Sequence, residues 1–561
     1  MHKKRTYVFK GLLLLGLLIG LNWLASHFFF RWDLTQDNRY TLSPAAKELI
    51  QQVDQPLIVD VFLAGDFPAE FRKLQQETRQ MLEEFQAYNG KIQFNFVNPL
   101  EDEGDANEIA TQFYQMGMTP ARINVVENGR SSESLIFPWA MGNYGEKSVV
   151  IPLMRNQVGA TTQERINNSV QHLEYALADA FSKLLYSKSK KIAVMRGNGE
   201  LPDARIADFI RSIQEYYFVA PFTLDSVASS PQRTLDELLD YDLIIEAKPT
   251  QAFTEEEKFV LDQYLMNGGK ALWLVDRVSM ETDSLFNPTG AGFAFPMDLN
   301  LDDFFFKYGI RINPQLVKDL YSAPIILASG TGNNTSFNPY PWPYFPLSAS
   351  LDDHPIINNI EAVRFEYANP IDTLQNTITK QVLLTSSPLS QIEGTPREVS
   401  LDQIQDKPDA QKYQHGPQTL GVLLEGEFSS VYQNRIKPFE YPGTLDRSST
   451  TSMIVISDGD VVKNELQQGQ PLELGFDQFT GATYGNKEFL VNAVNYLLDD
   501  RGLLEIRSKQ MSIPFLDLRQ VEEERTYWQI FNLIGPLVVL SLIAGVYQLV
   551  RSRRYKSSNK G

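Results

Sequence analysis

The chain has 561 residues, a formal net charge of −18 and no cysteine. The lack of cysteine excludes disulfides, thiolate metal sites and a Cys nucleophile, and the acidic balance argues against a nucleic-acid partner. The chain is too long for one hydrophobic core, so we expect about three domains.

Residues 11–30 form an apolar stretch without Asp, Glu, Lys or Arg. At roughly 1.5 Å per residue, a helix of about 20 residues crosses the ~30 Å hydrocarbon core of a bilayer. The stretch is longer than the apolar core of a secretory signal, and no small-residue cleavage site follows it. We therefore expect a retained transmembrane helix, in which Asn22 contacts a partner helix.

Residues 31–187 alternate between helical and strand patterns. Ser43 followed by Pro44 predicts the start of a helix, and apolar periodicity predicts strands at 57–63, 92–97, 121–126 and 148–152 and helices at 69–88, 105–116 and 161–186. This β-α-β-α-β-β-α order resembles the thioredoxin fold, with Thr119-Pro120 at the place of its cis-proline. Residues 64–68 stand where that fold has its pair of cysteines, so we expect no redox chemistry.

A second α/β unit, predicted at 188–505, begins with strands and helices in alternation. The patterns predict strands at 191–195, 243–246 and 270–275 and helices at 205–217 and 255–267. Such alternation is typical of a doubly wound parallel sheet of the flavodoxin or amidotransferase kind. These sheets bind ligands beyond the carboxyl ends of their strands, which makes Gly197, Asn198, Glu200 and Asp276 candidate ligand-binding residues. A tight strand-to-helix turn is the alternative for the three residues near 200, and we favour it.

From about 279 to 450 the pattern is irregular and predicts an insertion. Within it, the aromatic and proline run at 339–346 offers Tyr340, Trp342 and Tyr344 as a stacking platform for a carbohydrate or a peptide. A loop packed onto its own domain is the alternative interpretation.

Strand patterns return at 420–424 and 452–457, and a helix is predicted at 486–499. Asp458 and Asp460 directly follow the second of these strands, and paired carboxylates are weak candidates for binding a divalent cation. We favour a plain turn at the strand end and expect no metal site.

Residues 506–527 are predicted to form a juxtamembrane helix that leads into a second apolar stretch at 528–550. This stretch also lacks charged residues and is long enough to cross a membrane. Trp528, Asn532 and Pro536 are the residues of this helix that we expect to contact a partner.

Basic residues lie outside both apolar stretches, in the tails 1–10 and 551–561. They are Lys3, Lys4, Arg5, Lys10, Arg551, Arg553, Arg554, Lys556 and Lys560. Lys and Arg near a span stay in the cytoplasm, so we expect two spans, two cytoplasmic termini and an extracytoplasmic body at 31–526. Without these nine positive charges, the formal charge of the remainder is about −27.

Five sequence blocks carry a resemblance to a known family. They are RWDLTQDNRYTLSPAAKELI at 31–50, DLNLDDFFFKYGIRIN at 298–313, PYPWPYFP at 339–346, VISDGD at 455–460 and YGNKEFLVNAVNYLLDD at 484–500. Together they resemble the GldG family, the gliding-motility-associated auxiliary or substrate-binding-like components of ABC transporters.

The resemblance implies a non-catalytic partner of an ABC-type ATPase and a multi-span permease in a bacterial inner membrane, with the body in the periplasm. It also implies contact with membrane lipid and with other periplasmic motility proteins, and a central α/β unit similar to a domain of intraflagellar transport proteins.

The sequence lacks the motifs of the commonest enzyme sites. No GxxxxGK[ST] phosphate loop occurs, so another subunit has to hydrolyse any ATP, and the five histidines are never at ligand spacing. We expect no catalytic residue and no cofactor.

We therefore predict a transport-complex subunit whose body presents cargo or transmits force. The alternatives are a polysaccharide co-polymerase-like assembly protein, a periplasmic ligand-binding scaffold and a periplasmic enzyme with unrecognised residues.

Overall fold

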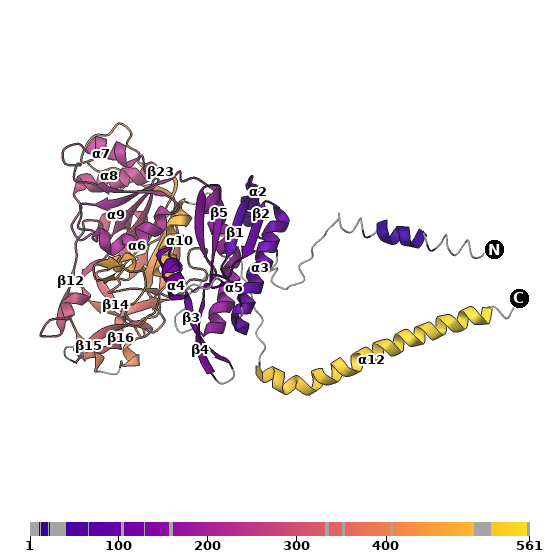
Figure 1. Cartoon of the computed structure of the whole chain (residues 1–561). Helices are drawn as coiled ribbons and strands as arrows, with labels where there is room; N and C mark the ends of the chain where they lie inside the picture. Colours follow the sequence, from indigo (N-terminus) through magenta and orange to yellow (C-terminus); the bar gives the residue numbers. More distant parts are fainter. Residues whose placement is uncertain are drawn as a thin grey trace. The chain divides into compact units, whose positions relative to one another are not determined.

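The computed structural model describes residues 11, 13–20, 22, 41–65, 67–101, 106–127, 130–155, 161–330, 336–349, 354–405, 408–498, 506 and 518–557. The chain divides into two compact units, Met1–Gln510 and Met511–Gly561. The first unit is mixed α/β, as the sequence predicts, and contains two main sheets (Figure 1). The second unit contains one long helix.

The first main sheet has the strand order β2-β1-β5-β6. β1 pairs in parallel with β2 and antiparallel with β5, and β5 pairs antiparallel with β6. The strands are β1 (Leu57–Val61), β2 (Ile92–Phe96), β5 (Trp139–Tyr144) and β6 (Lys147–Pro152), and the helices of this region are α2 (Pro44–Gln51), α3 (Ala69–Tyr88), α4 (Ala106–Gln115) and α5 (Thr162–Leu185).

Local sequence explains where two of these helices begin. The Ser43 side chain accepts the N–H of Ala46, and Pro44 fills the first turn of α2. Thr161 and Glu164 form a reciprocal capping box at the start of α5. The buried faces of α2, α3 and α5 then pack with β1 in one apolar core.

The third strand of this sheet is not the predicted one. Residues 121–126 lie in β3 (Ala121–Glu127), which pairs only with β4 (Arg130–Ile136), and the sheet is completed by β5. The sequence pattern does not reveal β5, because this strand contains Gly142. A Cβ added at Gly142 would lie 3.0 Å from Leu184 Cδ1. Thr119-Pro120 is not cis, since the one cis bond among the described residues precedes Pro396.

The second main sheet has seven strands in the order β19-β22-β23-β10-β9-β7-β8. The five from β23 to β8 are parallel, and β22 and β19 are antiparallel additions. The strands are β7 (Lys191–Arg196), β8 (Phe218–Thr223), β9 (Leu243–Ala247), β10 (Lys270–Leu274), β19 (Thr379–Thr385), β22 (Thr419–Ser429) and β23 (Arg447–Ile456).

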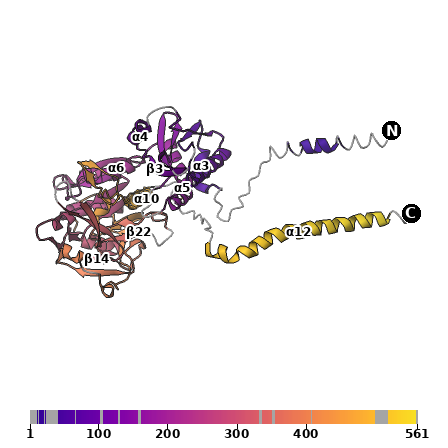
Figure 2. The same ribbon diagram turned by 60° about the horizontal axis from the view of Figure 1, so that its bottom comes forward.

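Helices cover both faces of this central sheet, and Figure 2 shows two of them, α6 and α10. One apolar core joins the sheet to α7, α8 and α9, and the other joins it to α6 and α10. These helices are α6 (Asp203–Gln214), α7 (Pro231–Leu238), α8 (Glu255–Met266), α9 (Asp302–Tyr308) and α10 (Asn486–Leu498). The central sheet is therefore parallel at its core and wound on both faces.

The stretch at 279–450, which the sequence suggested was irregular, contains many short strands. They form small antiparallel sheets: β11 (Val278–Ser279), β12 (Ala291–Pro296) and β21 (Arg397–Ser400); β13 (Ile310–Ile312) and β18 (Ile371–Thr373); β14 (Gln315–Asp319) and β20 (Ser390–Gly394); β15 (Ser322–Ser329), β16 (Ser336–Ser348) and β17 (Val363–Arg364). Their shortness and their prolines mask the strand pattern. A last hairpin joins β24 (Leu466–Gln467) and β25 (Gln470–Pro471).

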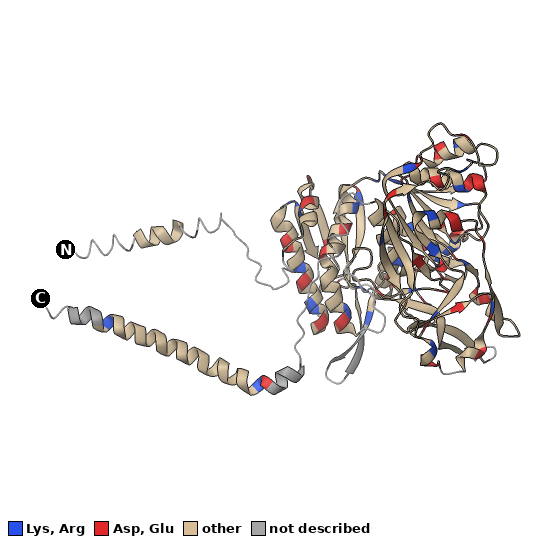
Figure 3. Ribbon diagram, turned by 180° about the vertical axis from the view of Figure 1, so that it is seen from behind, with Lys and Arg blue, Asp and Glu red and all other residues tan. Residues whose placement is uncertain are grey.

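The second unit contains α12 (Leu518–Ser557). Its segment Glu524–Ser552 is the one helix among the described residues that is long and apolar enough to cross a membrane. Figure 3 shows the long part of α12 that carries no Lys, Arg, Asp or Glu. Of the first apolar stretch, residues 11, 13–20 and 22 are described and helical, and the rest of the predicted span lies outside the described residues.

Candidate functional site

The carboxyl ends of β9, β10 and β23 bring four charged side chains together. Lys248 follows β9, Asp276 follows β10, and Asp458 and Asp460 follow β23. The three strands are adjacent and parallel, so their ends meet at one edge. One carboxylate oxygen from each aspartate lies within 4.8 Å of the others.

A lysine ammonium lies among these carboxylates. Lys248 Nζ is 2.6 Å from Asp460 Oδ2, 2.6 Å from Glu281 Oε1 and 3.7 Å from Asp276 Oδ2. Its side chain is only 4% exposed, and its backbone has a positive φ of 60°. Lys463 adds a second ammonium at 2.7 Å from Asp460 Oδ1. Lys248 and Lys463 thus supply the positive charge that balances the carboxylates at this edge.

Backbone groups hold the aspartates in place. Asp276 Oδ1 accepts the N–H of Gly459 at 2.7 Å, and Asp458 Oδ1 accepts the N–H of Asp460 at 2.7 Å. A Cβ added at Gly459 would lie 2.4 Å from Lys248 Cβ. The glycine between the two aspartates is therefore required because Lys248 packs directly against it.

Burial and neighbouring charges separate the pKa values of the aspartates. Burial, only partly opposed by Lys248, raises the pKa of Asp276 to about 6. Burial and the neighbouring Asp276 and Asp460 carboxylates raise the pKa of Asp458 well above its usual range. Burial acts the same way on Asp460, but Lys463 and Lys248 outweigh it and lower the pKa of Asp460 to about 2.

The charge of Lys248 is held by the same contacts. Burial alone would lower the pKa of Lys248, but the carboxylates of Asp460, Asp276 and Glu281 outweigh burial and keep it above its ordinary value. The three aspartates have the donor chemistry of a divalent-cation site. Lys248 and Lys463 lie against two of them, Asp276 and Asp460, so in this structure the arrangement is an ion-pair cluster at the strand ends.

Sequence reasoning names Asp276 as one candidate and the pair Asp458 and Asp460 as another, and it misses the two lysines and Glu281. Asp276 and Asp458 were assigned to different candidate sites, although the structure joins them. One signal was available: Lys248 directly follows its buried strand, and Asp276 and Asp458 each lie two residues after theirs.

The loop after β7 is a packed turn. The carbonyl of Asn198 accepts the N–H groups of Thr250 at 2.9 Å and Gln251 at 2.8 Å, and the Glu200 carboxylate accepts the N–H of Asn198 at 3.1 Å. Gly199 has a φ of +77°, and an added Cβ would lie 2.2 Å from Thr250 Oγ1. These contacts are those of the tight turn that we favoured for Gly197, Asn198 and Glu200.

A glutamate that sequence reasoning missed lies beside this turn. Glu246, on β9, is fully buried, and neither of its carboxylate oxygens has a hydrogen-bond partner among the residues described. Burial, with Glu200 and Glu257 nearby, raises the pKa of Glu246 well above its usual range. A charged residue inside an otherwise apolar strand was the signal that could have revealed it.

The aromatic run does not form a platform of three rings. Trp342 and Tyr344 on β16 are fully buried, and the Tyr344 hydroxyl donates to Glu393 Oε2 at 2.7 Å. Only Tyr340 is exposed, at 36%. The run is thus largely packed onto its own domain, and the interpretation of Trp342 and Tyr344 as ligand-stacking residues is wrong because no ligand can reach their faces.

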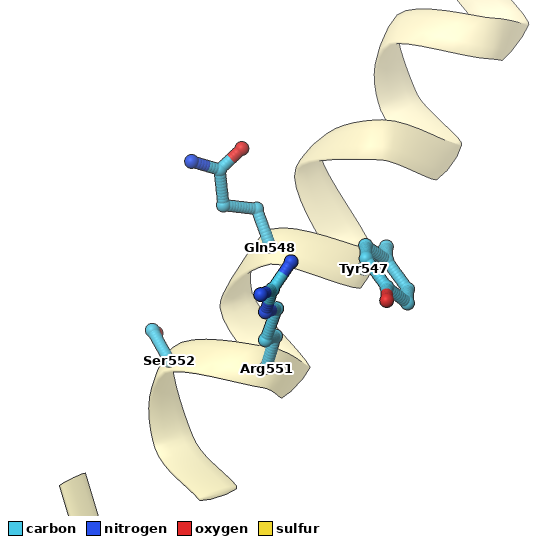
Figure 4. Close-up of a pocket in the computed structure, with 4 residues that line it drawn as sticks. All are labelled: Tyr547, Gln548, Arg551 and Ser552. Atoms are coloured by element: carbon cyan, nitrogen blue, oxygen red, sulfur yellow. The ribbon is translucent and has the colours of Figure 1, made fainter. Parts of the chain in front are cut away.

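On α12, Trp528, Asn532 and Pro536 lie within the apolar segment, and Trp528 Nε1 donates to Glu524 Oε2 at 2.9 Å. Asn22 is helical and exposed. Their contact with a partner helix stays a prediction. Figure 4 shows the four side chains that line a pocket farther along α12, which are Tyr547, Gln548, Arg551 and Ser552. All four belong to one helix, so they form an open face of that helix.

Comparison with known proteins places the chain in a family. The family model described as an ABC-type uncharacterized transport system matches residues 189–493, more than half of the chain. The chain belongs to this family. A second model, a domain of unknown function (DUF7088), matches residues 36–143. Membership supports an auxiliary role in an ABC-type transport system, association with its components and a non-catalytic function.

A relative from Borreliella burgdorferi, described as an uncharacterized protein, is 20% identical over 537 residues, 94% of each chain. Among solved structures, the mmIFT52 N-terminal domain aligns with 55% of this chain and 98% of its own at 12% identity and a TM-score of 0.32. A β-galactosidase from Rahnella sp. R3 aligns with 76% of this chain and 59% of its own at 11% identity and a TM-score of 0.20.

Proposed function

We propose that the chain is a non-catalytic, membrane-anchored subunit of an ABC transporter complex linked to gliding motility. Its large body lies in the periplasm and presents cargo or transmits force to the permease and the ATPase. The family match over residues 189–493 carries this proposal, and the membrane-compatible segment of α12 gives the body its anchor.

The proposed topology has two spans and two cytoplasmic termini in a bacterial inner membrane. Its support is the second apolar stretch at 11–30 and the nine basic residues in the tails. We propose spans at 11–30 and 528–550, a body at 31–505 and a juxtamembrane helix at 506–527.

Within the body, we propose a thioredoxin-like domain at 31–187 and a doubly wound domain at 188–505. The strand order β2-β1-β5-β6 supports the first, and the five parallel strands with helices on both faces support the second.

The ion-pair cluster supports the absence of catalysis by the body. Doubly wound sheets place their ligands at the carboxyl edge, and here Lys248 and Lys463 pair with the carboxylates at that edge. A phosphate loop for ATP is also missing from the sequence. Hydrolysis therefore belongs to another subunit.

Copurification tests the proposal. Affinity-tagged full-length chain is extracted from its native membrane in a mild detergent and analysed by mass spectrometry. We expect an ABC-type ATPase and a multi-span permease in stoichiometric amounts. The variant Leu542→Arg, in the apolar part of α12, should release both, whereas the control Lys437→Arg, on an exposed loop, should retain them. Recovery of neither subunit with the unaltered chain would refute the proposal.

The lack of cysteine allows a direct test of topology. Ala228→Cys, exposed on the body, and Asn559→Cys, in the C-terminal tail, each give the chain one thiol. A membrane-impermeant maleimide added to spheroplasts should label the first variant at once and the second only after lysis. The opposite order would overturn the proposed orientation.

A further inference from the structure

The ribbon formed by β15 and β16 lies in a part of the chain that has no charge. From residue 320 to residue 351 there is no Lys, Arg, Asp or Glu, although 21% of all residues are charged. Figure 1 shows the ribbon at the edge of the body, beside β14. Surfaces that lack charge and carry aromatic residues are typical of the centres of protein interfaces.

One half of the ribbon is anchored and the other half is exposed. Trp342, Tyr344 and Phe345 are buried in their own apolar core. At the other end, Phe337 is 53% exposed and lies 4.7 Å, between ring centroids, from Phe479, which is 48% exposed. The exposed half thus has a rigid base and an apolar surface.

The strand register places only apolar side chains on one face of this half. Pro324 pairs with Pro341, Ile326 with Pro339 and Ala328 with Phe337. Directly opposite residues of an antiparallel pair share a face, so these six side chains form one continuous apolar surface.

The prolines also determine which way the backbone groups point. Proline has no N–H, and Pro324 lies opposite Pro341, so these two residues cannot exchange ladder hydrogen bonds. Hydrogen-bonded and non-hydrogen-bonded pairs alternate along an antiparallel ladder. The pairs of Ile326 with Pro339 and of Ala328 with Phe337 are therefore also non-hydrogen-bonded pairs. The alternate pairs, such as Leu327 with Asn338, carry the bonds between the strands. The N–H and C=O groups of Ile326 and Ala328 therefore point to the outer edge of β15.

The two edges of the ribbon differ as a result. On β16, Pro339, Pro341 and Pro343 stand at alternate positions, so the outer edge has no N–H donor from Pro339 to Pro343, a device that prevents strand addition. On β15, Ile326 and Ala328 keep their donors, and no strand pairs with this edge in the part of the chain that the structure describes. Neither charge nor proline protects β15 from Ile325 to Ser329.

We propose that the outer edge of β15 is a docking site for an extended segment of a partner protein, which adds to the ribbon as a further strand. Main-chain hydrogen bonds to Ile326 and Ala328 provide affinity, and apolar side chains at every second position continue the apolar face. The partner segment is neutral or basic, because the chain carries a net charge of −18. The same charge disfavours a second copy of the chain in this place.

A synthetic strand peptide tests this inference on the full-length chain in detergent. The probe is acetyl-Lys-Thr-Val-Thr-Ile-Thr-Val-amide with a fluorescent label, and anisotropy measures its binding. We expect saturable binding at one site. Ala328→Pro removes an outward N–H of β15 and should weaken binding at least tenfold. The matched control is Phe337→Pro, directly opposite on β16, where the lost N–H points to the other edge of the ribbon, and it should leave binding within about twofold.

A second probe keeps the protein unchanged. Two peptides with the same side chains carry N-methyl groups at alternate residues, on one edge or on the other. One of them should lose binding and the other should keep it, because only one edge of the added strand faces β15. Equal binding of both, equal binding to Ala328→Pro, or no binding at all would overturn the proposal.

A second copy of the chain is the alternative occupant of the outer edge of β15. If Ala328→Cys in the otherwise cysteine-free chain forms a disulfide-linked dimer in high yield and the dimer excludes the probe, the site belongs to a second copy and the proposed partner segment is wrong. The inference does not depend on the transporter role, so its failure leaves the copurification result intact.

Discussion

The carboxyl edge of the central sheet and the β15–β16 ribbon use charge in opposite ways. At the sheet edge, charged residues from three adjacent strands are buried against one another, with Lys248 between Asp460 and Asp276. On the ribbon, charge is absent and apolar side chains are exposed. The carboxyl edge of the central sheet, where related architectures bind ligands, is covered by ion pairs of the chain itself. The outer edge of β15, a kind of edge that most proteins protect, is open.

The difference separates stability from recognition. Buried ion pairs stabilise only while both partners are present, because an unpaired buried charge is strongly destabilising. Exposed positions on a strand edge contribute little to stability and much to the choice of a partner. Substitutions at the sheet edge should therefore change folding, and substitutions at the open edge of the ribbon should change binding.

The largest effect is expected for Lys248→Met. The substitution keeps an apolar stem of similar length but leaves the carboxylates of Asp276 and Asp460 without their shared ammonium. We expect the free energy of local unfolding around β9, β10 and β23 to fall by about 3–5 kcal/mol. Hydrogen exchange measured by mass spectrometry would show it, with Lys437→Met, on an exposed loop, as the control. Unchanged protection of these strands would mean that the cluster does not hold the sheet edge.

Trp342→Ala should destabilise the ribbon and leave the central sheet unchanged. Its removal from the core beneath the ribbon leaves a cavity and should cost about 3 kcal/mol of local stability. Peptides from 322–349 should lose hydrogen-exchange protection while those from β10 keep it. If both regions lost protection together, the two would form one cooperative unit and the comparison would fail.

Asp276→Asn should stabilise the sheet edge at neutral pH. In the folded state the pKa of Asp276 is about 6, above its usual 3.8, so between pH 4 and pH 6 the folded state holds a proton that the unfolded state has released. Stability therefore falls as pH rises through this window. Asparagine carries no charge and still accepts the Gly459 N–H, so the variant should gain about 3 kcal/mol at pH 7 and equal the unaltered chain near pH 4.

The measurement is hydrogen exchange of β10 and β23 as a function of pH. Asp283→Asn, on an exposed turn, is the control and should reproduce the profile of the unaltered chain. Identical profiles for Asp276→Asn and its control would show that the carboxyl of Asp276 does not titrate in this window.

The smallest effect on stability is expected for Ser329→Lys. The side chain is exposed at the end of β15, so the thermal midpoint should move little, corresponding to less than ~0.5 kcal/mol. The added charge should nevertheless weaken binding of the strand peptide, as charged residues do on protected edges. Ser336→Lys, directly opposite on β16, is the matched control for binding. A large loss of stability in either variant would show that the ribbon end is packed.

Sequence patterns were reliable where one short segment contains the whole signal. The helix start at Ser43 and Pro44 and the alternation of β7, β9 and β10 with α6 and α8 could be predicted, because a helix cap or a buried strand depends on neighbouring residues. The strands of the insertion could not, since β14 pairs with β20 some 75 residues away. β5 was missed for a similar reason: its Gly142 makes sense only beside Leu184.

The sequence by itself determined the charge balance, the absence of cysteine chemistry and of a phosphate loop, and the two apolar stretches. Each of these is a property of composition or of consecutive residues. Only the tertiary structure decided that Lys248 joins Asp276, Asp458 and Asp460, and that Trp342 and Tyr344 are buried. It also decided that one edge of the β15–β16 ribbon has no donor from Pro339 to Pro343, whereas the other keeps those of Ile326 and Ala328. These properties depend on which strands are adjacent and in which register, and pairing over long sequence separations is set by the packing of the whole core.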